Sequence, residues 1–254
     1  MKPLSCLFKN EYFYAIHKPA NVPFHSLDDL KQDQELTHVE GIVSLAKKFL
    51  NDPDIYPVHR LDRMTSGLMI FARSPKANSE LSRLFQEKKI EKYYLALSEQ
   101  KPKKKQGAVI GDMTKGRSGS YLLKRSKDKP AITRFFAHKI RLGAVDAWFY
   151  TLKPETGKTH QLRVALKSLG SPVMCDKRYS GASASRGYLH AYKVRFDLFG
   201  KRYEIIDSLF EGEEFALQNI TSVADRYELA DQDDRLYLSS PEQLPWPKAS
   251  FLLS

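Results

Sequence analysis

The sequence predicts an α+β protein built on a mixed, mainly antiparallel β-sheet with flanking helices. Segments rich in β-forming residues outnumber segments with helical spacing. Most connections between them are short enough for antiparallel pairing. Hydrophobic residues make up 42% and charged residues 28% of the 254-residue chain, a composition typical of a globular protein rather than a disordered or fibrous one.

The first expected elements are a strand and a helix. Residues 12–16 are rich in β-formers and stop at Lys18 and Pro19, because proline cannot extend a β-ladder. Residues 41–50 carry apolar side chains at helical spacing, and Pro53 follows soon after the last of them. The sequence therefore predicts a strand, a loop and a helix in this order.

A polar loop over residues 56–67 comes before the next expected strand. Residues 68–72 are continuously apolar, which is typical of a buried strand. Ser74 and Pro75 then supply a capping side chain and a first-turn proline for a second helix, which is expected to run to about Lys89.

Strands dominate the second half of the expected fold. Residues 93–97 form one strand, and residues 107–153 form successive strands punctuated by Gly and Pro. Residues 158–168 have helical spacing, and two further strands are expected at residues 188–197 and 201–206.

Charge divides the chain into a basic body and an acidic tail. The formal net charge is +11, yet residues 206–254 contain three basic and ten acidic residues, which leaves 38 basic and 20 acidic residues in the body. A basic body suggests a polyanionic partner. Because no repeat or long linker divides the body, we expect one domain over residues 1–210 and an acidic C-terminal extension over residues 211–254.

Cysteine count and hydropathy indicate a reducing, cytoplasmic location. Only Cys6 and Cys175 are present, so a disulfide framework is not indicated. The N-terminal apolar stretch is too short for a secretory signal, and no run of 18 apolar residues predicts a membrane span.

Four segments carry residues suited to chemistry. The first is the polar loop before the strand at residues 68–72, whose candidates are His59, Arg60, Asp62, Thr65 and Ser66. A carboxylate there can be positioned rigidly by the sheet beneath it. The alternative is an ordinary turn in which Asp62 or Ser66 caps the backbone, and an isolated Asp would favour that alternative.

The other three segments each allow a structural alternative. Strand alternation points Tyr93 and Tyr94 to opposite faces, so one can be a core residue while the other faces a cleft. In the helix expected at residues 158–168, Thr159 and Arg163 lie four apart on one face, and the helix N-terminus favours anions. A solvated amphipathic helix would explain that pattern as well. The fourth segment contains His190, which a hydrogen-bonded core position would equally explain.

Taken together, these segments resemble the RluA-type pseudouridine synthases. The family signature His-Arg-Leu-Asp, two further residues and Thr-Ser-Gly is matched at residues 59–67. A second family block, Thr-Gly-Arg-Thr-His-Gln followed by an aliphatic residue and Arg, is matched at residues 156–163 with Lys158 in place of its first Arg. The similarity covers residues 7–210 and includes Lys18, Pro19, His25, Lys92, Tyr94, Ala96, Lys129, Pro130, Ala131, Thr133, Leu189, His190 and Ala191.

The resemblance implies a single catalytic domain, without the S4 domain of some relatives, that isomerises a uridine in RNA. It implies that Asp62 is the catalytic carboxylate, that Arg163 pairs with it and that Tyr94 stacks on the target base. Arg60 would help to displace the target nucleotide, and Leu189 would form an apolar wall of the pocket. The remaining substrate-binding residues expected from the matched motifs are His59, Thr65 and Lys158.

The chain departs from the family pattern beside the expected site. Ala165 stands where the family often has His, and Ser180 stands where Gly is usual. Residues 171–176, Ser-Pro-Val-Met-Cys-Asp, replace a typical His-Pro-Ile-x-Gly-Asp. These differences concern substrate preference and not the reaction.

The implied reaction suits these residue types. It breaks the N-glycosidic bond, turns the uracil and rejoins it through carbon 5, so it needs no metal or redox cofactor. A carboxylate can act as nucleophile or proton acceptor, and the sequence leaves both roles open for Asp62. Arg163 would favour the ionised carboxylate by opposite charge. Unstacking the target base costs a few kcal/mol, of which stacking on Tyr94 could offset roughly 1–3 kcal/mol.

One segment, expected to form loops and a hairpin, concentrates nine basic residues: Lys103, Lys104, Lys105, Lys115, Arg117, Lys124, Arg125, Lys127 and Lys129. We expect this basic segment to grip the backbone of an rRNA or tRNA stem-loop, whereas the alternative is a merely solvated surface. The protein is expected to be a monomer with no membrane association.

Three other functions agree less well with the sequence. A noncatalytic RNA-binding module could share the basic surface but would not need Asp62 with Arg163. A zinc hydrolase is disfavoured because the seven histidines form no His-x-x-x-His pair and the cysteines no Cys-x-x-Cys pair. A Ser-His-Asp hydrolase is disfavoured because the chain lacks a Gly-x-Ser-x-Gly elbow.

Overall fold

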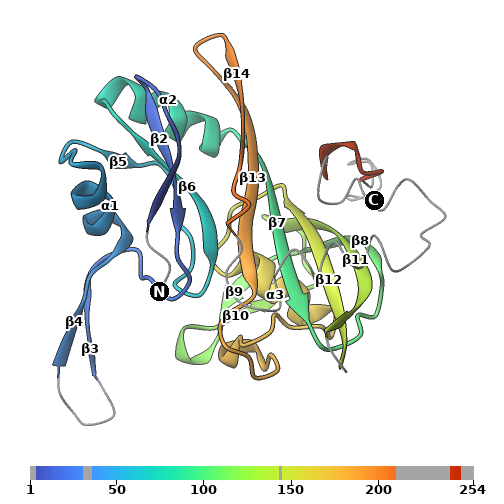
Figure 1. Cartoon of the computed structure of the whole chain (residues 1–254). Helices are drawn as coiled ribbons and strands as arrows, with labels where there is room; N and C mark the ends of the chain where they lie inside the picture. The colour runs from blue at the N-terminus through green and yellow to red at the C-terminus, as the bar shows by residue number, and fades with distance from the viewer. Residues whose placement is uncertain (1–3, 31–35, 143–144, 210–240, 247–254) are drawn as a thin grey trace. The chain divides into compact units, whose positions relative to one another are not determined.

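β-strands dominate both parts of the chain, and the predicted α+β class is confirmed. The structure, a computed structural model, describes residues 4–30, 36–142, 145–209 and 241–246 (Figure 1). The chain divides into unit 1, residues 1–91 with 190–211, and unit 2, residues 92–189 with 212–254. Most of the expected acidic extension, residues 211–254, lies outside the described residues. In the described ranges, no helix is both long and apolar enough to cross a membrane.

Unit 1 contains a mixed sheet in the order β1-β2-β6-β13-β14, with β5 paired to β6 (Figure 1). Its strands are β1 (Ser5–Lys9), β2 (Phe13–Lys18), β5 (Tyr56–Pro57), β6 (Ser66–Ala72), β13 (Leu189–Leu198) and β14 (Lys201–Ile206). Strand β6 runs parallel to β13, with Ser66 opposite His190, whereas the other described pairings of this sheet are antiparallel. A separate hairpin joins β3 (Leu27–Leu30) to β4 (Leu36–Val39).

The helices described in unit 1 are α1 (Ile42–Leu50) and α2 (Pro75–Gln86). Helix α2 begins as its sequence predicts, because the Ser74 Oγ accepts the Ala77 N–H at 3.2 Å. Its Leu81 and Leu84 are buried among side chains of β6, β13 and β14. Burial of each leucine stabilises the folded state by about 1.5–3 kcal/mol. This packing holds β6, and with it the end of the preceding loop, in place.

Unit 2 contains an antiparallel sheet in the order β7-β12-β11-β8. Its strands are β7 (Glu91–Ser98), β8 (Gln106–Gly111), β11 (Ala131–Leu142) and β12 (Val145–Pro154). A small hairpin pairs β9 (Met113–Lys115) with β10 (Tyr121–Leu123) around the 3-10 turn η1 (Arg117–Gly119). Among the residues of unit 2 that the structure describes, the remaining elements are α3 (Gln161–Ser168) and the 3-10 turns η2 (Lys177–Tyr179) and η5 (Pro241–Gln243).

Helix α3 begins three residues later than the sequence predicts. His160, expected inside the helix, has φ 57° and is therefore in the left-handed region, which a right-handed helix cannot contain. Thr159 consequently lies outside the helix, and the prediction that Thr159 and Arg163 share one helical face is wrong.

The described part of the C-terminal extension packs on unit 2. The Trp246 ring meets the Phe136 ring edge-on, with 5.0 Å between centroids, and lies 6.2 Å from the Tyr93 ring. The Trp246 indole N–H donates to the Pro241 carbonyl at 2.8 Å. Leu244 is also buried. The short segment 241–246 is thus attached by an aromatic contact.

Candidate active site

The loop between β5 and β6 presents Asp62 from an anchored backbone. Leu61 and Thr65 on either side of it are buried, at 4% and 2% exposure, whereas Asp62 itself is half-buried. The Thr65 N–H donates to the Asp62 carbonyl at 3.0 Å and closes a tight turn. Within this turn, Asp62 is the carboxylate that remains accessible.

His59 holds the start of this loop against β6 and α2. Its Nε2 accepts the Ile70 N–H at 3.0 Å, and its ring stacks on Phe85 with 4.6 Å between centroids. The sequence predicts a substrate-binding role for His59. These contacts give the side chain a part in supporting the loop, and its role in substrate binding stays a prediction.

Lys18 lies fully buried and binds the backbone of the same loop. Its Nζ donates to the carbonyls of Pro19 at 2.8 Å, Arg63 at 3.2 Å and Thr65 at 2.7 Å. Burying an ammonium group costs free energy unless acceptors replace its water, and these carbonyls do so. Two of them, those of Arg63 and Thr65, follow Asp62 closely in the chain, so Lys18 fixes the path of the backbone there. The sequence placed Lys18 in the family pattern without giving it this role.

A buried chain of hydrogen bonds continues from the end of the loop through β13 to β2. The Ser66 Oγ bonds the His190 Nδ1 at 2.9 Å, and the His190 Nε2 bonds the Asp207 carbonyl at 2.8 Å. The Asp207 carboxylate bonds the His17 Nδ1 at 2.7 Å. All four residues are fully buried. Ser66 is therefore no nucleophile for an external substrate, and the core role considered for His190 is confirmed.

The bond directions at His190 follow from its partners. A carbonyl can only accept, so Nε2 carries a proton. When the ring is neutral, Nδ1 accepts from the Ser66 hydroxyl. This chain ties Ser66 of β6 to Asp207, which lies 141 residues later. It stabilises the strand on which the Asp62 loop ends.

Arg163 of α3 is held in unit 2 by a two-pronged ion pair. Its Nε and Nη2 donate to the Asp176 carboxylate at 2.7 and 2.8 Å, and its Cζ lies 5.1 Å from the centre of the Tyr179 ring. Arg163 is 7% exposed and Asp176 is 1% exposed. Bidentate pairing fixes the plane of the guanidinium. The sequence predicted Asp62 as a partner of Arg163 and did not anticipate Asp176.

Polar residues around Gly157 attach α3 to β11. The Gln161 Oε1 accepts from the Thr156 hydroxyl at 2.7 Å and from the Lys158 N–H at 3.0 Å. The Gln161 Nε2 donates to the Ile132 carbonyl and the Thr133 hydroxyl, each at 3.0 Å. The side chain of Lys158 is exposed. Thr156 and Gln161 thus support the segment that carries Arg163.

The two tyrosines of β7 divide as predicted. Tyr93 is fully buried, whereas Tyr94, the next residue on the strand, is half-buried. The other candidates differ in accessibility: Leu189 is buried, and Arg60 is exposed with its Cζ 5.5 Å from the centre of the Phe24 ring.

The basic side chains of the segment are exposed, and the predicted hairpin within it is confirmed. All nine of its Lys and Arg residues are exposed. Its loop at residues 126–129 is held by Asp112, whose carboxylate accepts the Lys129 and Asp128 N–H groups at 2.9 and 3.1 Å. A hydrogen bond from the Ser126 hydroxyl lowers the pKa of Asp112, with these backbone bonds contributing less.

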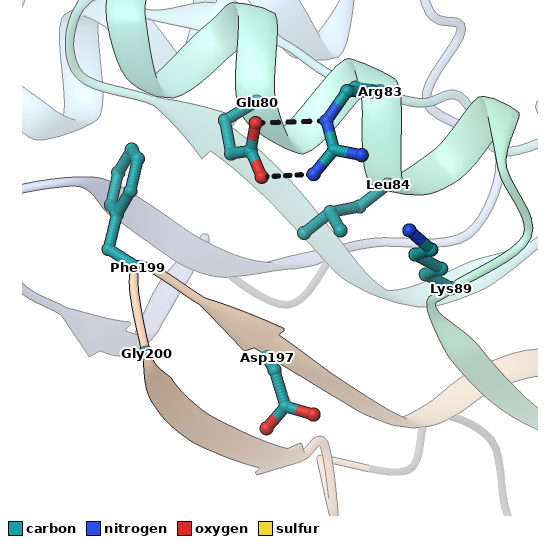
Figure 2. Close-up of a pocket in the computed structure, with 7 residues that line it drawn as sticks. All are labelled: Glu80, Arg83, Leu84, Lys89, Asp197, Phe199 and Gly200. Carbon is teal, nitrogen blue, oxygen red and sulfur yellow. Dashed lines mark hydrogen bonds and ion pairs between the residues drawn. The ribbon is translucent and has the colours of Figure 1, made fainter.

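A surface pocket of about 460 Å³ lies in unit 1, apart from the sequence-predicted residues. Figure 2 shows its lining: Glu80, Arg83, Leu84, Lys89, Asp197, Phe199 and Gly200. Arg83 pairs with Glu80 at 2.6 Å, and Asp197 pairs with Arg202 at 2.8 Å. With its acidic groups already paired and none of the predicted site residues in its lining, this pocket adds nothing to the candidate site.

Comparisons with known proteins agree on one family. Residues 12–168 match the family RNA pseudouridylate synthase. An uncharacterized RNA pseudouridine synthase of Haemophilus influenzae is 46% identical over 196 residues, which cover 76% of this chain and 82% of that protein. One of Zymomonas mobilis is 33% identical, over 77% of this chain and 89% of that protein.

More distant relatives and solved structures extend the picture. Ribosomal large subunit pseudouridine synthase C of Vibrio vulnificus is 29% identical over 75% of this chain and 60% of that protein. The structure of human RNA Pseudouridylate Synthase Domain Containing 1 superposes with a TM-score of 0.66 at 22% identity, covering 87% of this chain and 98% of that chain. This likeness supports the fold.

Proposed function

Because the chain belongs to the RNA pseudouridylate synthase family and is an RNA pseudouridine synthase, we propose that Asp62 is the carboxylate on which its reaction depends. The observation that carries this proposal is the anchoring of the Asp62 loop. Lys18 binds the carbonyls of Arg63 and Thr65, while the Asp62 residue itself is only partly buried. A catalytic group needs this combination of a fixed backbone and an accessible side chain.

The reaction requires an ionised side chain beside the sugar of the target nucleotide. The bond between uracil N1 and ribose C1′ breaks, a bond between C5 and C1′ forms, C5 loses its proton and N1 gains one. A carboxylate can assist by attacking the sugar or by removing a proton, and both routes need its ionised form. Asp62 supplies such a group without any metal or redox cofactor.

The proposal assigns Arg163 and Tyr94 to the same nucleotide as Asp62. Asp176 fixes the plane of the Arg163 guanidinium, and we propose that Arg163 also pairs with the Asp62 carboxylate. Tyr94 stacks on the displaced base, for which a half-buried aromatic ring is suited. In this assignment Leu189 forms an apolar wall, and Arg60 and Lys158 contact the RNA. His59 and Thr65 act by holding the loop.

The substrate we propose is a stem-loop of large-subunit ribosomal RNA, with a tRNA stem-loop as the second candidate. Support comes from relatives named ribosomal large subunit pseudouridine synthases, in Vibrio vulnificus and Borreliella burgdorferi. We further propose that the protein works in the cytoplasm as a monomer, with unit 2 supplying the phosphate contacts. A noncatalytic RNA-binding role is the alternative, and loss of product without loss of RNA binding on changing Asp62 excludes it.

Neutralising four cations of the basic segment is expected to weaken RNA binding and its dependence on salt. The four changes are Lys104→Gln, Lys105→Gln, Lys124→Gln and Arg125→Gln. Each phosphate contact to single-stranded RNA contributes about 0.7 to the slope of log affinity against log salt, so the slope should fall by about 3. Filter-binding assays at a series of salt concentrations measure this slope.

A control variant removes the same charge from exposed lysines of unit 1: Lys48, Lys76, Lys88 and Lys201. If that control lowers the slope as much as the basic-segment variant does, the effect is one of net charge. The basic segment would then not be the RNA-binding surface.

A further inference from the structure

Tyr179 stands where three parts of unit 2 meet. Its hydroxyl oxygen accepts the Tyr121 N–H of β10 at 2.9 Å and bonds the Nδ1 of His160, the residue before α3, at 3.0 Å. Its ring lies against the Arg163 guanidinium, with 5.1 Å from Cζ to the ring centre. At 5% exposure the whole side chain is buried. One residue thus contacts the basic hairpin β9–β10, the start of α3 and Arg163.

The hydroxyl and the ring of Tyr179 have separate partners. The hydroxyl oxygen accepts the backbone N–H of Tyr121, and the hydroxyl, which carries one proton, also bonds the His160 Nδ1. Burial raises the pKa of the Tyr179 phenol, so it keeps that proton. The ring supports Arg163 by a cation–π contact that needs no hydroxyl. Removing the hydroxyl alone therefore breaks the bonds to the hairpin and to His160 but keeps the ring contact with the guanidinium.

The basic hairpin depends on such attachments. Each of its strands has three residues, and an isolated two-stranded hairpin is marginally stable at best. Residues of η2 attach it twice: Tyr179 through the Tyr121 N–H, and Arg178 by donating from Nη1 to the Ser118 carbonyl. Lys115 and Arg117 lie on this hairpin, and both are exposed.

We propose that Tyr179 is a positioning residue that serves both RNA binding and catalysis, through its hydroxyl for the basic hairpin and through its ring for Arg163. This inference rests on the proposed function, in which the hairpin binds RNA and Arg163 acts with Asp62. Its two halves predict different kinetic consequences. Loss of the hydroxyl weakens RNA binding, whereas loss of the ring also lowers the rate of the chemical step.

The test compares Tyr179→Phe with Tyr179→Leu. Tyr179→Phe removes the hydrogen bonds to Tyr121 and His160. It is expected to raise KM for RNA by about fivefold, the effect of losing the Tyr121 bond that holds the hairpin, with kcat within about twofold of the wild type. Tyr179→Leu is expected to raise KM similarly and to lower kcat by at least about tenfold, because the guanidinium loses its aromatic support. Hydrogen exchange at the Tyr121 amide should be faster in both variants.

A matched control is Tyr203→Phe, which removes a buried hydroxyl of unit 1 that accepts from the Asn10 side chain at 3.2 Å. It is expected to leave KM, kcat and Tyr121 exchange unchanged. The proposal is overturned if Tyr179→Phe leaves either KM or Tyr121 exchange at the wild-type value, or if it lowers kcat as much as Tyr179→Leu does. Should Arg163→Met retain full kcat, the proposed function of Arg163 fails, while Tyr121 exchange still reports the hairpin attachment.

Discussion

Asp62→Asn is expected to abolish pseudouridine formation and to leave RNA binding intact. Asparagine has the size of aspartate but can neither attack the sugar nor accept a proton, so kcat should fall by at least about a thousandfold. The loop should keep its shape, because the bonds that hold it use the backbone of Asp62, Arg63 and Thr65. Mass spectrometry of the RNA product measures kcat, and filter binding measures affinity.

The control for this variant is Asp54→Asn, which neutralises an exposed carboxylate of unit 1. Its kcat should equal that of the wild type. If Asp62→Asn keeps a tenth or more of the wild-type kcat, Asp62 is not the essential carboxylate. Another group must then perform its role.

Gly67→Ala is expected to destabilise unit 1 severely. Gly67 has φ +110°, and a Cβ there would lie 2.4 Å from the Ala191 carbonyl oxygen and 2.6 Å from its nitrogen. These are backbone atoms of β13, so no side-chain rotation relieves the clash, and β6 must separate from its parallel neighbour. We expect the free energy of unfolding to fall by at least about 4 kcal/mol. Denaturant titration measures the loss.

Two other glycines separate backbone strain from the clash. Gly200 has φ +78° with no described atom within 4 Å of its added Cβ, so Gly200→Ala should cost about 1–3 kcal/mol from strain alone. Gly157 has neither a positive φ nor a described atom within 4 Å, so Gly157→Ala should change the stability little. If Gly67→Ala is no less stable than Gly200→Ala, then the close approach of β6 and β13 is not the reason for glycine at position 67.

Local sequence patterns predicted most of the fold because the elements concerned are determined locally. The Ser74-Pro75 cap, the alternation of Tyr93 and Tyr94, and the strand at Lys201–Ile206 all follow from neighbouring residues. The start of α3 did not follow. His160 is left-handed and bonds Tyr179, a residue 19 positions later, and no local signal shows this.

The supports of the candidate site were harder to predict than its motifs. The family signature matched at residues 59–67 indicated Asp62, but the Lys18 ammonium that binds the Thr65 carbonyl comes from 47 positions earlier. Asp207 counts in composition as part of an acidic tail. In the structure it is fully buried and bonded to His17. Such pairings depend on topology, which a charge count does not contain.

Pseudouridine mapping of total RNA is the measurement that addresses the reaction most directly. Cells that lack the protein should lose pseudouridine at one uridine. If the proposed substrate is correct, that uridine lies in large-subunit rRNA. The wild-type gene should restore that modification, and the gene encoding Asp62→Asn should not. Unchanged modification at every uridine in the deletion, or restoration by Asp62→Asn, would contradict the central claim.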